Sequence, residues 1–272
     1  MKKRILLLLL LIITELTYAQ EILITKTIDS THNAVVALMR LDSTGKVLTR
    51  ATGVLINPRV ILTAGHVNYK RYPDGLDRRG FVAPSNNALQ TNKYIPFDWI
   101  DNVLTHPDYI KLTNSTKDTA LHLDRNTIPD IGLIFLDTPV ENMPVAKLPK
   151  PLLFSSLPSG TSFLGVGYGY NRVRDSTFKF SYIDGIRRKW KPERISVFND
   201  FWLETMPDSV SHQPFTTVAD SGAPLLIDDN TIIGITHGGR TVPNSSGFSR
   251  IDNPAVLNWI KSAVKKKLGI DL

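Results

Sequence analysis

Short β-forming runs, each bounded by turn-forming residues, recur along most of this sequence. Glycine, proline, asparagine and aspartate separate them, as in strands joined by tight turns. The clearest runs are Ala34 to Leu38, Gly53 to Ile56, Ile131 to Leu136, Ser162 to Val166 and Thr231 to Ile235. This spacing predicts an all-β protein, built as a sandwich or a barrel.

One segment, the last, has a clear helical pattern. Asp252 or Asn253 can cap its start, and Pro254 suits its first turn. Lysines close the segment, where the helix dipole favours positive charge. The apolar residues Val256, Leu257, Ile260 and Val264 form a stripe at helical spacing. We expect a C-terminal helix packed on the β core.

The middle of the chain suggests a division into two halves. Residues 68–129 are polar and rich in turn formers, and we interpret them as loops around a few strands. The stretch from Leu148 to Pro151 is the best candidate for a link. A chain of 272 residues, 42% of them hydrophobic, is long enough for one large core or two modest ones.

The N-terminus has the pattern of a signal peptide. Basic residues at positions 2–4 precede an apolar run from Ile5 to Ile13, and small residues at Thr17 and Ala19 suit a signal peptidase. The apolar run is too short for a permanent membrane anchor. We therefore expect residues 1–19 to be removed, with a cut after Ala19 or Gln20, and the protein to be periplasmic or secreted. The compact segment suggests a bacterial source.

Cysteine content and charge exclude several classes of protein. The chain has no cysteine, so disulfides, thiolate nucleophiles and thiolate metal sites are ruled out. The formal net charge is +7, but the basic residues are dispersed apart from two short groups. These are Arg187, Arg188, Lys189 and Lys191, and Lys265 to Lys267. We interpret both groups as solvated faces and expect no nucleic-acid partner.

Three local patterns carry the residues of a nucleophilic site. Thr63 to His66 follow a predicted strand, Asp130 opens another, and Ser221 lies in the turn from Ala219 to Pro224. A serine hydroxyl needs an imidazole to take its proton, and the imidazole needs a buried carboxylate to fix its tautomer. Of the acidic rivals Asp108, Asp118 and Asp124, none abuts a buried-looking strand as Asp130 does.

In this order the patterns resemble those of the trypsin and chymotrypsin family, whose motifs are close to TAAHC, DIAL and GDSGGP. Three further segments fit the family. Gly167 to Gly169 are similar to its GWG turn, Gly234 to Gly239 to its GIVSWG strand, and Gly247 to Arg250 to the segment before its terminal helix. The resemblance covers roughly residues 30 to 265.

The resemblance implies a serine endopeptidase that acts on polypeptides through an acyl-enzyme. Ser221 would be the nucleophile, His66 the general base and later acid, and Asp130 the orienting carboxylate. The expected fold is two antiparallel six-stranded β-barrels with a C-terminal α-helix. Residues 20–147 would form the barrel with the histidine and aspartate, and residues 148–272 the barrel with the serine. Neither a metal nor an organic cofactor is required.

The family also suggests how the oxyanion hole forms. The backbone N–H groups of Ala219 and Ser221 would supply it, although the family has glycine where Ala219 stands, because the turn needs a conformation costly for a side chain. The family's counterpart of Asp220 pairs with a new N-terminal amine. We expect signal cleavage before Gln20 or Glu21 to supply this amine; a later cut after Lys26 is a further possibility.

The substrate pocket departs from the familiar patterns. Phe215 stands where the family carries its selecting residue, so no acidic group is there to bind Lys or Arg. The other residues expected to line the pocket are Thr216, Thr236, His237, Gly239 and Gly247. Apolar substrate side chains rank first. Acidic ones rank second, because glutamyl-specific relatives use a histidine and hydroxyls near this strand.

Two rival functions remain. A catalytically inactive member of the family could bind a protein partner through the same cleft, and Ala219 and Phe215 keep this alternative open. An α/β-hydrolase esterase would need G-x-S-x-G and the order Ser, Asp, His, and the sequence has neither. The remaining histidines, His32, His106, His122 and His212, lack metal-ligand spacing and are interpreted as surface or structural. The oligomeric state stays open.

Overall fold

The structure is a computed structural model of the whole chain. It describes residues 26–41, 47–68, 78–115, 128–169, 185–192, 194–206, 216–228, 230–239 and 246–272. The predicted signal peptide, residues 1–19, lies outside these ranges, so its prediction stays untested. In the described ranges no helix is both long and apolar enough to cross a membrane.

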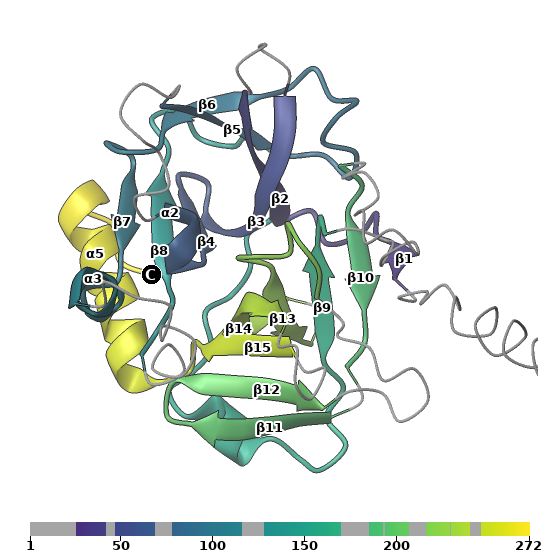
Figure 1. Ribbon diagram of the computed structural model, residues 1–272, viewed down its shortest axis with the longest axis vertical. Helices are drawn as coiled ribbons and strands as arrows, with labels where there is room; N and C mark the ends of the chain where they lie inside the picture. The colour runs from purple at the N-terminus through teal and green to yellow at the C-terminus, as the bar shows by residue number, and fades with distance from the viewer. Residues whose placement is uncertain are drawn as a thin grey trace, which may run out of the picture.

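Strands from the first half of the chain form an antiparallel sheet of seven strands in the order β6-β5-β2-β3-β4-β8-β7 (Figure 1). Their bounds are β2 Val35–Leu41, β3 Val47–Asn57, β4 Val60–Thr63, β5 Arg79–Ala83, β6 Ile95–Asp98, β7 Val103–Thr105 and β8 Gly132–Phe135. Strands β2, β3 and β4 follow one another in the sequence and pair antiparallel with their neighbours.

The second antiparallel sheet has eight strands in the order β1-β10-β9-β13-β14-β15-β12-β11. Their bounds are β1 Thr27–Ile28, β9 Leu164–Gly167, β10 Arg188–Trp190, β11 Arg194–Asn199, β12 Trp202–Met206, β13 Pro224–Ile227, β14 Thr231–Gly239 and β15 Ser246–Arg250. Strand β1 comes from the N-terminal part of the chain but pairs with β10. The N-terminal segment therefore crosses to the sheet of the second half.

The C-terminal helix α5 (Pro254–Leu268) forms as predicted. Asn253 caps it by accepting hydrogen bonds from the N–H groups of Ala255 and Val256, at 2.8 and 3.4 Å. Its buried residues are Val256, Leu257, Ile260 and Val264, the predicted stripe. Figure 1 shows α5, in yellow, beside β7, β8 and α3. The helix of the second half thus packs against the sheet of the first.

Three shorter helical segments complete the described elements. They are α2 (Gly65–Asn68), α3 (Pro107–Ser115) and the 3-10 helix η2 (Leu153–Ser156). Helix α3 lies in the segment interpreted from sequence as loops and strands. Tyr109 in this helix is buried, at 2% exposure, but the helix has nine residues, too few for a helical period to stand out in a polar segment.

Alternation along the strands divides the apolar residues between two core clusters. On β13, Leu226 joins the larger cluster with the seven-stranded sheet and α5, whereas Leu225 and Ile227 join a smaller one with Leu203 and Phe248. Successive side chains of a strand point to opposite faces, so β13 contributes to both. The predicted all-β class with a C-terminal helix is confirmed, but six strands for each half is wrong. Edge strands β1 and β7 are only two and three residues long, too short to show a pattern.

The basic group near residue 188 is not the solvated face expected from sequence. Arg187 is fully buried and donates from Nε to Asp29 Oδ2 at 2.8 Å. Its other nitrogens donate to Asn33 Oδ1 at 2.7 Å and to the carbonyl oxygen of Val35 at 3.0 Å. A guanidinium can be buried when its N–H groups find acceptors in this way. Arg187 therefore anchors the N-terminal segment to the start of β10.

Replacing Arg187 tests this anchor. Arg187→Met leaves the Asp29 carboxylate buried without its cation, and we expect a loss of about 3–5 kcal/mol in the free energy of unfolding. Arg78→Met is the matched control, because Arg78 also binds two aspartates but is 46% exposed. Urea unfolding should show a far smaller change for the control. Equal effects of the two variants would contradict the proposed anchoring.

Candidate active site

His66 lies at the first turn after strand β4. Thr63, the last residue of β4, donates from Oγ1 to the carbonyl oxygen of Thr52 at 2.8 Å, which fixes the strand end. The chain then turns into α2, and the backbone N–H of His66 donates to Asp130 Oδ1 at 2.7 Å. Backbone as well as side chain therefore holds His66 against Asp130.

Asp130 is fully buried directly before β8. Its backbone N–H donates to Ser249 Oγ, on β15, at 3.0 Å. The Asp130 backbone is thus tied to the second sheet while its side chain faces a residue of the first. A carboxylate at this junction can join residues from both halves of the chain.

Ser221 lies in the tight turn before β13, packed closely against the first sheet. The N–H of Thr52 donates to the Ser221 carbonyl oxygen at 2.9 Å, and the N–H of Gly222 donates to the Thr236 carbonyl oxygen at 2.8 Å. Gly222 has a φ of +84°, and a Cβ atom there would lie 2.1 Å from the carbonyl oxygen of Thr52. Only glycine fits a position with both constraints.

The structure brings His66, Asp130 and Ser221 together in one hydrogen-bonded chain. Ser221 Oγ lies 2.8 Å from His66 Nε2, and His66 Nδ1 lies 2.6 Å from Asp130 Oδ2. A carboxylate can only accept, so His66 must carry its proton on Nδ1. Its Nε2 lone pair is then free to accept the Ser221 proton, as a general base requires.

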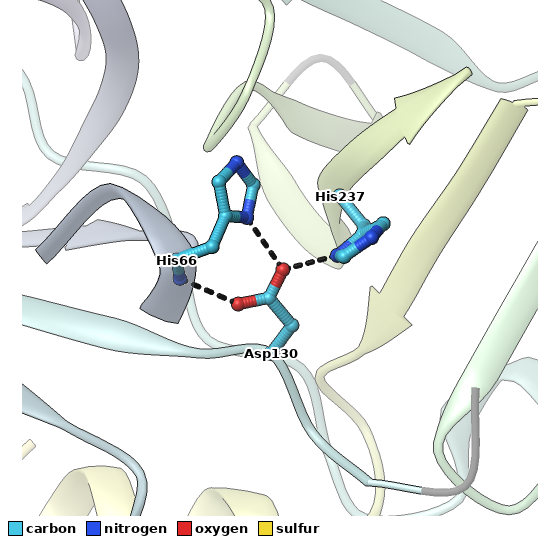
Figure 2. A group of neighbouring side chains, drawn as sticks. All are labelled: His66, Asp130 and His237. Atoms are coloured by element: carbon cyan, nitrogen blue, oxygen red, sulfur yellow. Dashed lines mark hydrogen bonds and ion pairs between the residues drawn. The ribbon is translucent and has the colours of Figure 1, made fainter. Parts of the chain in front are cut away.

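His237, on β14, is a second histidine on the same carboxylate (Figure 2). Its Nδ1 hydrogen-bonds Asp130 Oδ2, the oxygen that His66 also binds. The His237 ring packs between two others, with centroids 5.2 Å from His66 and 5.1 Å from Trp202. Sequence reasoning placed His237 in the substrate pocket and missed this contact with Asp130.

The surroundings of Asp130 keep it ionised. Burial alone would raise its pKa, but the charge interactions and hydrogen bonds with His66 and His237 outweigh burial and hold the pKa of Asp130 well below its usual value of 3.8. Asp130 therefore stays a carboxylate throughout the pH range in which histidines titrate.

The same three side chains also meet the composition of a metal site. Ligand atoms of His66, Asp130 and His237 all lie within 4.8 Å of one another. Both Nδ1 atoms, however, already hydrogen-bond Asp130, so a metal ion bound through them would have to displace both of their protons. The hydrogen-bonded arrangement fits proton transfer through His66 better than metal binding.

Ala219 adopts the backbone conformation that the sequence analysis considered costly. Its φ is +72°, in the left-handed region, and its carbonyl oxygen accepts from Thr52 Oγ1 at 2.8 Å. Within the described ranges, the N–H groups of Ala219 and Ser221 have no acceptor. Two unpaired N–H groups beside the Ser221 hydroxyl are what an oxyanion hole requires.

Asp220 forms a buried ion pair, but its partner is a side chain. Lys26 Nζ contacts Asp220 Oδ2, and both side chains have no exposed surface. The residues expected to carry a terminal amine, Gln20 and Glu21, lie outside the described ranges. Asp220 also explains the two glycines of the GWG-like turn, because a Cβ atom on Gly167 or Gly169 would collide with the Asp220 carboxylate.

The predicted pocket residues are only partly placed. Phe215 lies outside the described ranges. Thr216 is buried and donates from its backbone N–H to Ser246 Oγ at 3.1 Å, and Thr236 is buried in β14. Gly239 pairs with Ser246 in the ladder between β14 and β15.

Trp202 was missed by the sequence analysis. Its ring lies against Gly247, where a Cβ atom would come within 2.2 Å of Trp202 Cζ2. No sequence signal separated Trp202 from a core tryptophan.

The rival acid and histidines that the structure describes, Asp108, His32 and His106, lie in other contacts. Asp108 is half-exposed on α3, where Lys111 Nζ lies 3.3 Å from it. Asp118, Asp124, His122 and His212 lie outside the described ranges. His106 is buried beside Trp259, with ring centroids 4.8 Å apart, and His32 binds Asp29 at 2.7 Å. Both described histidines are thus structural.

Comparison with known proteins identifies similar folds. The sequence model of the family described as Trypsin matches residues 25–260. No curated protein sequence matches. The solved structure of GrC aligns with a TM-score of 0.61 and 20% identity, over 89% of this chain and 99% of GrC. The structure of a Glu endopeptidase in complex with MPD aligns with a TM-score of 0.60 and 19% identity, over 88% of this chain and 95% of that chain.

The VesB protease of Vibrio cholerae also aligns, with a TM-score of 0.60 and 15% identity, over 89% of this chain and 68% of that protease. Identities this low indicate a shared fold. The predicted chymotrypsin-like architecture is therefore confirmed apart from its strand count.

Proposed function

This chain belongs to the trypsin family, and we propose that it is an exported serine endopeptidase that hydrolyses peptide bonds through an acyl-enzyme. Its family and the proteases of similar fold support a serine protease. The observation that carries the proposal is the continuous hydrogen-bonded chain from Ser221 through His66 to Asp130.

In the first step Ser221 Oγ attacks the carbonyl carbon of the substrate. The Oγ–H bond breaks as His66 Nε2 takes the proton, and the carbonyl π electrons move onto its oxygen. When the tetrahedral intermediate collapses, the C–N bond breaks and His66 returns the proton to the leaving amine. Water then repeats the sequence on the ester, with His66 as base, and releases the acid and Ser221.

Two groups stabilise the charges that develop. Asp130, held as a carboxylate, faces the imidazolium that forms on His66. The N–H groups of Ala219 and Ser221 would bind the oxyanion, which exists only in the transition state and the intermediate. The positive φ of Ala219 supports this assignment, since the family uses glycine there.

His237 would act as a positioning residue through Asp130. Its Nδ1 donates to the oxygen that also accepts from His66, so it restricts rotation of the carboxylate. Its side chain is 19% exposed, and in the described part of the chain the Ser221 hydroxyl hydrogen-bonds His66 and not His237. We assign it no proton transfer with the substrate.

The substrate proposal keeps the order reached from sequence, with apolar side chains before acidic ones. The region around Gly247 is apolar, because the buried ring of Trp202 packs on this glycine. His237 and Thr216 lie in the same region and supply polar groups.

Substitution of the reacting groups tests the enzyme proposal against the inactive binding protein. Ser221→Ala and His66→Ala should each lower kcat for peptide hydrolysis by about 10⁶-fold, and the double variant should be no worse, because the two groups act as a unit. Ser156→Ala, on η2, is the control and should keep wild-type activity. If the wild-type protein hydrolyses no member of a diverse peptide library, the result would favour the alternative of an inactive, protein-binding family member.

The pH dependence of activity tests His66 as the general base. Activity should fall as His66 gains a proton, at about pH 6 to 7 where histidines usually titrate, while Asp130 with its lowered pKa stays charged. Activity that persists undiminished well below this pH would contradict the role of His66 as the general base.

A further variant separates positioning from packing. His237→Leu removes the donor to Asp130, and we expect kcat to fall about tenfold, the effect of about one hydrogen bond. His237→Gln can still donate and should restore most of kcat. Equal kcat values for His237→Leu and His237→Gln would contradict a positioning role.

A further inference from the structure

We propose that Lys26 is the permanent counterion of Asp220, so that the oxyanion turn is organised without a new N-terminal amine. The inference rests on the proposed function, because the turn matters only if Ser221 is a nucleophile. It differs from the expectation in the sequence analysis, in which cleavage of the chain creates the cation.

The Asp220 carboxylate has no exposed surface and accepts hydrogen bonds at both oxygens. Oδ1 accepts from the N–H of Gly169 at 2.9 Å. Oδ2 accepts from the N–H and the hydroxyl of Thr217, at 2.8 and 3.0 Å, and from Lys26 Nζ. A terminal amine would have to displace one of these donors to reach Asp220.

The ammonium group of Lys26 is equally well held. Its Nζ also donates to Thr217 Oγ1 at 3.2 Å and lies 4.6 Å above the ring of Trp190. The Lys26 side chain has no exposed surface. A cation in such a dry site is stable only with its partner, and an aromatic face adds to its stabilisation.

The N-terminal segment is anchored where it delivers Lys26. Strand β1 begins one residue later and pairs with β10, and the Asp29 N–H donates to the Arg187 carbonyl oxygen at 2.9 Å. The buried pair of Asp29 with Arg187 fixes the same segment through side chains. These contacts place Lys26 independently of the residues that precede it.

Asp220 connects this ion pair to the catalytic turn, because it stands between Ala219 and Ser221. Its N–H donates to the Thr217 carbonyl oxygen at 3.0 Å, and its own carbonyl oxygen accepts from Ala223 N–H at 2.8 Å. With the side chain held by Lys26, the turn keeps Ala219 at its positive φ. A buried carboxylate without a cation is strongly unfavourable, so loss of Lys26 would drive Asp220 out and disturb both N–H groups.

The pH dependence of a lysine differs from that of an arginine at this position. Burial lowers the pKa of Lys26 below its ordinary value, against the opposing effect of Asp220. The charged groups that face it are Asp220 and, with the opposite influence, Arg188. Activity should therefore fall on the alkaline side at a lower pH than that at which an ordinary lysine titrates, as Lys26 loses its proton.

The test distinguishes the two possible sources of the cation, the Lys26 side chain and the N-terminal amine. The full chain is purified in its exported form and with a short Gly-Ser extension inserted after Ala19, and mass spectrometry identifies both N-termini. We expect equal kcat/KM for the two forms. Lys26→Met should lose about 100-fold, mainly in kcat, as expected when an oxyanion donor is misplaced. Lys191→Met, an exposed lysine nearby, is the control and should be unaffected.

Lys26→Arg adds a readout that a merely structural role would not move. It should keep activity, and its alkaline limb should shift to higher pH, because a guanidinium stays charged. An extension that abolishes activity while Lys26→Met keeps it would overturn the inference in favour of the terminal amine. If Lys26→Met fails to fold, the extended wild type and Lys26→Arg still decide the question.

The inference and the proposed function fail in different ways. Absence of hydrolysis by every form overturns the proposed function. The ion pair is then decided by urea unfolding of Lys26→Met, Asp220→Asn and the double variant. If the double variant loses less free energy of unfolding than the two single variants together, the ion pair is supported. If the losses are strictly additive, the ion pair is overturned.

Discussion

The buried carboxylate of Asp130 is the interaction on which the site depends. It has no exposed surface and receives the backbone N–H of His66 and the Nδ1 atoms of two histidines. An ion buried this deeply is tolerable only with such donors. Satisfying Asp130 therefore fixes the orientation and the tautomer of His66, and that tautomer leaves Nε2 free toward Ser221. The residues come from both halves of the chain, so the site exists only when both sheets have formed.

A chain without cysteine must hold this junction by packing and buried polar contacts. Three ion pairs do so around the second sheet. Lys26 binds Asp220, Arg187 binds Asp29, and Arg250 binds Asp252 at 2.5 Å. In each pair the buried charged groups find hydrogen-bond partners inside the protein. Buried charge is tolerated in a fold under this condition. Two of the three tie down the N-terminal segment, the part of the chain that crosses to the second sheet.

Much of the fold could be predicted from sequence, because local patterns specify it. Turn residues marked the five clearest runs, which overlap β2, β3, β8, β9 and β14, and Asn253 with the stripe from Val256 to Val264 marked helix α5. The order of the motifs brought His66, Asp130 and Ser221 into one hypothesis. Contacts between distant residues could not be predicted in this way. Nothing near Lys26 in the sequence indicates Asp220, 194 positions away, and Arg187 looked like a surface residue because burial of a guanidinium depends on acceptors that only folding supplies.

The central claim is that Ser221 is an activated nucleophile, and its covalent modification is the most direct measurement. The purified protein would be treated with a fluorophosphonate at neutral pH, digested and analysed by mass spectrometry. The account predicts one phosphonylated residue, Ser221, formed at a rate that falls when His66 gains a proton. Modification spread over several serines, or none at Ser221 in a folded protein, would contradict it.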